Sequence, residues 1–146
     1  MQQDISKISL YYRQSARAIE LGVHLRNEKS MFCYDDYYIY DTIDVTTKTL
    51  DYSALCTPLL LKLMDYDALY NTNFTQSLFV YLACNCNLAE SARICGIHRN
   101  SMDYRIKKIQ ELFDVNLDDP EEVFSISFSF KLLIHHKKFK PVIAHP

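Results

Sequence analysis

The chain of 146 residues is 49% hydrophobic and 23% charged, with 16 basic and 18 acidic residues and a net charge of −2. This length predicts one domain, or one small domain with a fragment, and the apolar content excludes a disordered chain. No segment approaches the ~20 apolar residues of a membrane-spanning helix, and the charges throughout the N-terminal region argue against a signal peptide.

The first part of the chain is predicted to be helical, with one short strand. Residues 5–21 carry apolar residues at helical spacing, and Gly22 is the expected C-terminal stop. The stretch at 31–34 is predicted to form a strand, and Asp35 or Asp36 could cap a following helical turn. The apolar positions of the first helix are Ile8, Tyr12, Ala16 and Ile19.

A loop and two helices are predicted next. Residues 44–49 are polar and form the loop, whereas residues 53–66 are apolar and helical. Pro58 must therefore occupy a first helical turn or mark a kink, because proline lacks the N–H that a helix interior needs. Residues 73–85 form an amphipathic helix, since their apolar side chains recur at helical spacing.

The segment after residue 117 combines two conflicting signals. Asp119 is a good N-cap and Pro120 suits the first helical position, which predicts a helix start. Residues 124–130 alternate with period two and by pattern alone would form a strand. Because the start signal is strong and no strand partner lies nearby, we expect a helix.

Residues 87–112 hold five of the 16 basic residues and one of the two glycines. Asn87 is a predicted helix N-cap, with Glu90 completing a box-like pairing. Gly96 suits a position with positive φ, and a second helix is predicted from about His98. A local basic charge in an acidic chain is expected where one face meets phosphate.

The second of these helices has two distinct faces. Four apolar side chains fall close to one line and predict a core stripe: Met102, Ile106, Ile109 and Phe113. The remaining faces carry amide, guanidinium, phenol and ammonium groups. Two short helices joined by a glycine turn describe a helix-turn-helix, although a helix pair with one polar face can also be merely a solvated surface.

Several motifs occur in order between residues 60 and 133: YD at 66–67, YL at 81–82, NLAESAR at 87–93, GIHRNSMDYRIKKIQEL at 96–112 and LDDPEE at 117–122. In this order they resemble the C-terminal DNA-binding domain of PucR/CdaR-type bacterial transcriptional regulators. The resemblance implies a mainly α, Fis-like helix-turn-helix bundle, with a helix after DPEE.

The N-terminal residues resemble the same regulators less closely. Residues 12–22 and 31–43 are similar to the end of the GGDEF-like middle domain, which implies a small N-terminal α/β remnant. An effector could then act only through a missing upstream region. The expected divisions are a partial regulatory remnant at 1–50, a linking helix at 51–72, the helix-turn-helix domain at 73–140 and a frayed tail at 141–146.

The resulting hypothesis is a sequence-specific regulator that binds double-stranded DNA in the nucleoid of the cytoplasm. Side chains that would reach base edges are Arg99, Asn100 and Tyr104. Asp103 departs from the pattern of these regulators, which often carry a basic or neutral residue at this position. Its carboxylate repels phosphate unless it accepts a hydrogen bond from the cytosine N4 amine or pairs with Arg99 or Lys107. The residues expected to hold phosphates or set register are His98, Ser101, Arg105, Lys107 and Lys108.

One such module makes few contacts, so we expect a homodimer on a two-fold site. The alternative is a dimerisation or signal-transmitting fragment whose helix-turn-helix no longer binds DNA. We expect neither an enzyme nor a cofactor, because the five histidines and five cysteines show no catalytic or metal-binding spacing and no glycine-rich loop is present. His135 and His136 are expected at a solvated helix end.

Overall fold

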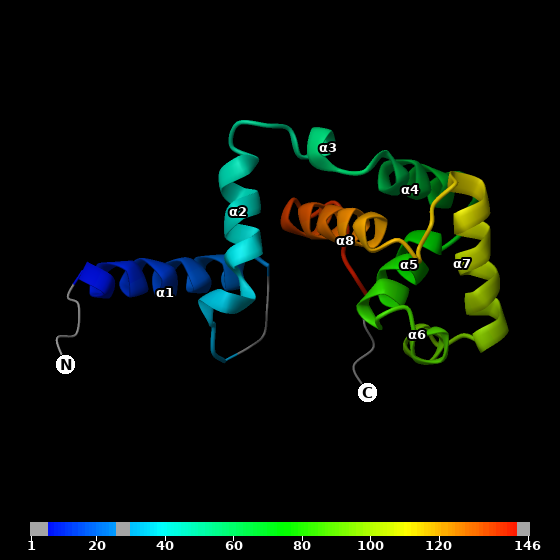
Figure 1. Ribbon diagram of the computed structural model, residues 1–146, viewed down its shortest axis with the longest axis horizontal. Coiled ribbons are helices and arrows are strands. Elements are labelled where there is room, and N and C mark those ends of the chain that lie inside the picture. Colours follow the sequence, from blue (N-terminus) through cyan, green and yellow to red (C-terminus); the bar gives the residue numbers. More distant parts are fainter. Residues whose placement is uncertain (1–5, 26–29, 143–146) are drawn as a thin grey trace. The chain divides into compact units, whose positions relative to one another are not determined.

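The computed structural model describes residues 6–25 and 30–142, and over these residues the chain is helical with no β-strand (Figure 1). The prediction of a mainly α fold is confirmed. The chain divides into two compact units, residues 1–52 and 53–146. None of the helices in the described ranges is long and apolar enough to cross a lipid bilayer.

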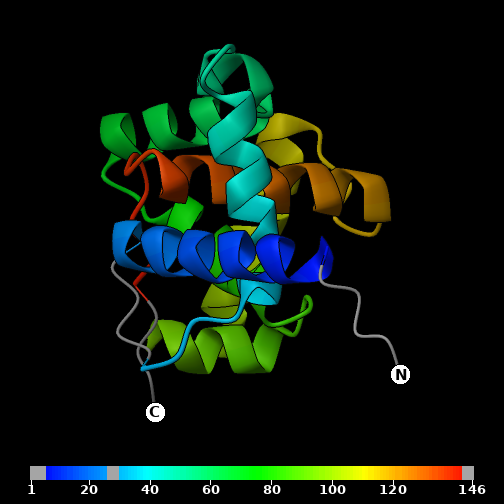
Figure 2. The same cartoon turned by 90° about the vertical axis from the view of Figure 1, so that its left-hand side faces the viewer.

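The first unit contains α1 (Ser6–His24), the 3-10 helix η1 (Tyr34–Asp36) and α2 (Tyr38–Thr46). Helix α2 crosses α1, as Figure 2 shows. The predicted strand at 31–34, and with it the α/β character of the remnant, is wrong. Phe32 and Tyr34 instead pack against the small core that α1 and Tyr37 form.

Gly22 lies inside α1 and does not end it, so the predicted stop is also wrong. A Cβ atom at this position would lie 2.3 Å from Cδ1 of Phe32, so the glycine makes room for the ring. The apolar stripe predicted for α1 faces outward, with Tyr12 75% and Ile19 54% exposed. Ala18 and Leu21, on another face of the helix, form the buried contacts.

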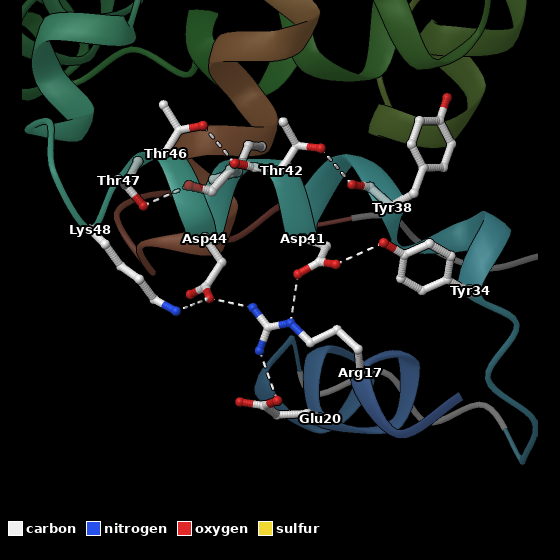
Figure 3. Close-up of polar contacts among 11 residues, drawn as sticks. Arg17, Glu20, Tyr34, Tyr38, Asp41, Thr42, Asp44, Thr46, Thr47 and Lys48 are labelled. Carbon is white, nitrogen blue, oxygen red and sulfur yellow. Dashed lines mark hydrogen bonds and ion pairs between the residues drawn. The ribbon is translucent and has the colours of Figure 1, made fainter. Parts of the chain in front are cut away.

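A polar network joins α1 to η1 and α2 (Figure 3). The Arg17 guanidinium donates to Asp41 Oδ1 at 2.6 Å and to the carboxylates of Asp44 and Glu20. The Tyr34 hydroxyl donates to Asp41 Oδ2 at 2.7 Å. Helix α2 begins after Tyr37, whose side chain makes no cap hydrogen bond, so the expected capping by Asp35 or Asp36 is wrong; both acids lie within η1.

Two helices occupy the region where one was predicted over residues 53–66. A short α3 (Tyr52–Leu55) crosses the boundary between the units, and α4 (Pro58–Tyr70) follows. Pro58 occupies the first turn of α4, where its missing N–H costs no hydrogen bond. Helix α2 also extends to Thr46, into the predicted loop.

The second unit continues with α5 (Phe74–Ala83), α6 (Leu88–Cys95), α7 (Arg99–Phe113) and α8 (Pro120–His135). Helices α5, α7 and α8 contribute large aliphatic side chains to its core. Helix α6 contributes the small side chain of Ala92. The fully buried members include Leu60, Leu63, Leu78, Met102, Ile109, Ile126, Leu132 and Leu133.

The conflict at residues 124–130 is resolved in favour of a helix. Asp119 accepts a hydrogen bond from Glu121 N at 2.9 Å, which starts α8 as predicted. Ser129 Oγ donates to the Ser125 carbonyl at 2.8 Å, so a serine that suggested a strand by pattern is accommodated inside the helix. Ile126 is buried, whereas Phe124 is 66% exposed.

The chain after α8 turns back onto α5. His135 is buried, so the expectation of a solvated end is wrong for this residue. The Phe139 ring lies 5.4 Å from that of Phe79 and 5.2 Å from that of Phe130, measured between centroids. Val142 exchanges two hydrogen bonds with the Gln76 amide. The rest of the predicted frayed tail, 143–146, lies outside the described residues.

Candidate nucleic-acid interface

The N-terminus of α6 is closed by Asn87, as predicted. Asn87 Oδ1 accepts hydrogen bonds from Ala89 N at 3.0 Å and Glu90 N at 3.1 Å. These bonds satisfy two backbone donors that a helix start otherwise leaves free. The Glu90 carboxylate pairs with Arg93 at 2.6 Å, so it supports the first turn of α6 through an ion pair with the next.

The turn between α6 and α7 depends on Gly96. Its φ of 64° lies in the left-handed region, and the Ile97 N–H donates to the Ala92 carbonyl at 3.0 Å across the turn. This geometry is a helix C-cap of the kind that glycine favours. The predicted turn is confirmed.

Helix α7 begins at Arg99, one residue later than expected, because His98 is its N-cap. The imidazole Nδ1 of His98 accepts a hydrogen bond from Asn100 N at 3.2 Å. The histidine is exposed at the start of the helix. The capping bond fixes the direction in which α7 leaves the turn.

The inner face of α7 is anchored to the second unit. Met102, Ile106 and Ile109 are buried, which confirms the predicted core stripe at these positions, whereas Phe113 is half-buried. The Phe113 ring meets the Tyr66 ring edge to face with centroids 6.1 Å apart. Figure 1 shows α7 beside α5 and α6, and both helices contact it. A helix held in this way presents its opposite face as a rigid surface.

The predicted site residues all lie on α7 or at its N-cap, and their exposure differs. Three of them are half-buried: Asp103, Arg105 and Lys108. The exposed members are His98, Arg99, Asn100, Ser101, Tyr104 and Lys107. The first four of these are consecutive, so the N-terminal end of α7 is the part of the helix most open to a partner.

Two ion pairs run along the outer side of α7. Lys107 Nζ lies 2.8 Å from Asp103 Oδ2. Asp103 therefore pairs with Lys107, one of the two basic partners considered for it. Lys108 Nζ lies 3.7 Å from Glu111 Oε2. Both pairs are solvent-exposed and therefore weak, which leaves the lysines able to exchange their carboxylate for another anion.

Arg105 points toward α5 and away from this row. Its Nη1 donates to the Ser77 hydroxyl at 2.9 Å, and that hydroxyl donates in turn to the Asn73 carbonyl at 2.8 Å. The bond ties α7 to the first turn of α5. Ser77 was not singled out from the sequence, because nothing local marks a serine 28 residues upstream as a partner of Arg105.

Asp67 is a second residue whose function the sequence did not reveal. Its carboxylate accepts from Phe74 N and Thr75 N, both at 2.8 Å, and so caps α5 from the preceding helix. It belongs to the YD pair at 66–67, which was noted only as part of a motif. The cap fixes the helix against which α7 packs.

The histidine, cysteine and acidic side chains of the described residues are spread over the structure. No group of three histidine, cysteine or acidic side chains is placed to hold a metal ion there. Burial raises the pKa of the Cys84, Cys86 and Cys95 thiols, which favours their unreactive protonated forms.

This helix-turn-helix has a counterpart among known families. Residues 74–132 match the family described as the PucR C-terminal helix-turn-helix domain. The chain carries a PucR helix-turn-helix domain. The matched PucR segment begins with the first residue of α5 and ends within α8, so it contains every helix that supports the turn at Gly96.

Three regulators of Bacillus subtilis (strain 168) are similar to this chain. The DNA-binding transcriptional activator AdeR is 24% identical over 129 residues, or 88% of this chain and 31% of AdeR. The purine catabolism regulatory protein is 34% identical over 38% of this chain and 10% of its own length. The proline-responsive transcriptional activator PutR is 37% identical over 41% of this chain and 14% of its own length.

The chain therefore spans about a third of AdeR and less of the other two regulators. The AdeR alignment is longer than the second unit, so the likeness to AdeR extends beyond the PucR domain into the first unit. All three proteins are described as regulators and not as enzymes, in agreement with the expectation from the sequence. No solved structure matches the chain.

Proposed function

We propose that this protein is a sequence-specific DNA-binding transcriptional regulator whose helix α7 enters the major groove. The observation that carries this proposal is the exposed run His98–Ser101 at the start of a helix whose inner face is buried. Side chains near the N-terminus of a recognition helix reach furthest into the groove. AdeR, similar over most of this chain, is itself described as a DNA-binding activator.

Base recognition is assigned to three exposed side chains. Arg99 can donate two hydrogen bonds to guanine and Asn100 can pair with adenine, which are the contacts these side chains favour in the major groove. Tyr104 lies one turn further along and is 62% exposed. Its ring can contact a thymine methyl group while its hydroxyl remains free to donate or accept.

Backbone contacts are assigned to the residues around these three. His98 and Ser101 flank the start of α7, and Lys107 and Lys108 lie two to three turns later, where a helix leaves the bases. Arg105 sets the register of α7 through its bond to Ser77. Helix α7 carries four basic and two acidic side chains, a net charge of +2 that favours phosphate.

Mutation of base-reading and phosphate-binding residues separates the two kinds of contact. A binding site is first selected from random DNA with the full chain. Replacing Arg99 or Asn100 with alanine is expected to weaken binding to that site by about 1–3 kcal/mol and binding to random DNA much less. Replacing Lys107 or Lys108 should weaken binding to all sequences alike and reduce the salt slope by roughly one counterion each.

The same experiment tests the alternative of a degenerate module that transmits a signal or dimerises. A module of that kind would show no salt-sensitive shift with mixed DNA, because it would make no phosphate contacts. Wild-type binding that none of the four substitutions altered would remove DNA recognition from α7 and favour this alternative.

A further inference from the structure

A cavity of about 510 Å³ lies behind the turn of the helix-turn-helix. One wall is the first turn of α5, a second is the turn around Gly96, and Arg105 of α7 and Val142 complete the lining. Cavities of this size accept small organic molecules. The lining belongs entirely to the second unit and so does not depend on the first.

Arg105 is the charged side chain of this lining, and no carboxylate accompanies it there. The guanidinium has five N–H donors, of which one is bonded to Ser77. Its other donors make no hydrogen bond or ion pair with any residue in the described ranges. Arg105 is the cation of a lining that holds no acidic side chain, so an anion is the group that complements the charge of this cavity.

The remaining walls define the body of the ligand. Ile94, Ile97 and Val142 supply apolar surface, and Val142 is held in place by its two hydrogen bonds to Gln76. Asn73 lines the same cavity, and its side-chain NH2 group can serve as a second donor. A charged end and an apolar end thus lie within one partly open cavity.

We propose that this cavity binds a small organic carboxylate, with its carboxylate on Arg105 and Asn73 and its apolar body against Ile94, Ile97 and Val142. Arginine pairs with carboxylates through two parallel hydrogen bonds, which suits the donors left after the bond to Ser77. A DNA phosphate is the less favoured occupant, because the sugar–phosphate backbone gains little from apolar walls. The ligand would touch both the turn and α7, and its binding stabilises the folded second unit.

Thermal melting and calorimetric titration of the full chain without DNA test the site. The probe is 4-methylpentanoate, with 4-methylpentanamide as the uncharged match and inorganic phosphate as the anion without an apolar body. We expect a saturable rise of the melting temperature with the carboxylate and none with the amide. Arg105→Gln should weaken carboxylate binding about tenfold or more, the scale of a hydrogen bond to a charged group.

Two variants separate loss of the ligand contact from loss of structure. Ser77→Ala removes the bond that positions Arg105 but keeps the guanidinium, and Arg99→Gln removes an arginine of the same helix outside the cavity. Arg99→Gln should bind the carboxylate as wild type does, and Ser77→Ala should bind it more weakly than wild type but more tightly than Arg105→Gln. Equal binding of carboxylate and amide, or unchanged binding in Arg105→Gln, would overturn the proposal.

Binding of a DNA phosphate to Arg105 would give a different result. If phosphate binds as well as the carboxylate and Arg105→Gln lowers the salt slope of DNA binding by about one counterion, the partner of Arg105 is the DNA backbone and the proposal is overturned. The titration needs no DNA, so failure of carboxylate binding leaves the proposed regulatory function standing. Loss of DNA binding likewise leaves the cavity test intact.

Discussion

The two glycines of the chain are needed for different physical reasons. Gly22 has ordinary helical geometry, and a side chain there would collide with the Phe32 ring. Gly96 has open space around the position of a Cβ atom but a φ of +64°. At the residue scale, therefore, one glycine is explained by packing and the other by backbone conformation.

Replacing Gly96 with valine is expected to destabilise the protein by on the order of 1 kcal/mol or more, because a β-branched residue is strained at positive φ. Gly96→Asn should cost less, since asparagine tolerates the left-handed region best among residues with a side chain. Urea unfolding measures both. No atom lies within 4 Å of the added Cβ, so the expected cost comes from the backbone conformation and not from a clash of that atom. Wild-type stability and DNA binding in Gly96→Val would contradict the turn.

Replacing Asp103 with asparagine is expected to tighten binding to all DNA sequences. The change releases Lys107 from its 2.8 Å ion pair and removes a negative charge from the outer side of α7. The affinity for DNA, measured across a range of salt concentrations, should depend on salt more steeply, by roughly one released counterion. Relaxed specificity at one base pair, without tighter non-specific binding, would instead mean that Asp103 reads a cytosine. Glu121→Gln, which removes an acid from α8, controls for net charge.

At the scale of the elements, helices are joined by polar contacts as well as by apolar packing. Arg17 connects α1 with α2, and Arg105 connects α7 with α5. Burial opposes ionisation of Asp41, but the hydrogen bonds from Arg17 and Tyr34 outweigh it and hold the carboxyl pKa below its ordinary value. The pKa of Asp44 is lowered in the same way, by Arg17 and Lys48 against the cost of burial.

These shifts predict how the contribution of Arg17 depends on pH. Because the folded-state pKa of both carboxyls is lowered, their stabilisation is complete above the unfolded value of about 4 and is lost as the pH falls through the folded pKa. Arg17→Met should therefore lower the melting temperature at pH 7, and the difference from wild type should narrow below about pH 4. Circular dichroism melts measure this.

Arg13→Met is the matched control for this prediction. Arg13 lies on the same helix and is exposed, and its Nε donates to the Ser9 carbonyl rather than to an acid. It should melt close to wild type at every pH. A constant deficit of Arg17→Met from pH 7 to pH 3 would show that the arginine stabilises α1 through packing and not through the two carboxylates.

At the scale of the whole molecule, charge is unevenly distributed along the chain. Residues 1–72 carry seven basic and ten acidic side chains, whereas residues 73–112 carry five and three. The excess of positive charge coincides with α5 to α7, the helices of the proposed interface. An acidic remainder limits non-specific attraction to DNA elsewhere, so the electrostatic field favours approach by the α7 face.

One α7 offers few base contacts, so we predict that two copies bind together. Sites selected from random DNA should be two-fold symmetric, with half-site centres one helical turn of about 34 Å, or a multiple of it, apart. Sedimentation of the complex should give two chains per site. Recovery of asymmetric sites bound by a single chain would contradict the prediction and show that one module suffices.

Much of the fold was predictable because its signals are local. Asn87, Asp119 and Pro120 act within three residues of their own position, so their helix starts could be read directly from the sequence. Gly96 likewise needed only its neighbours. The site residues could be placed on one helix for the same reason, since helical spacing alone separates the buried stripe from the outer face; which of them contact DNA stays a prediction.

Other features were decided only by the tertiary structure, because they depend on residues that are distant in sequence. Phe32 turned into the α1 core because Gly22 leaves space for its ring, so residues 31–34 formed no strand. Ser77 and Arg105 lie 28 residues apart, and their bond directs the guanidinium toward α5 and the cavity instead of along the outer face of α7. The position of a residue in the helical repeat specifies the face of the helix that it occupies. The direction in which its side chain points depends on which groups the folded chain brings within hydrogen-bonding distance.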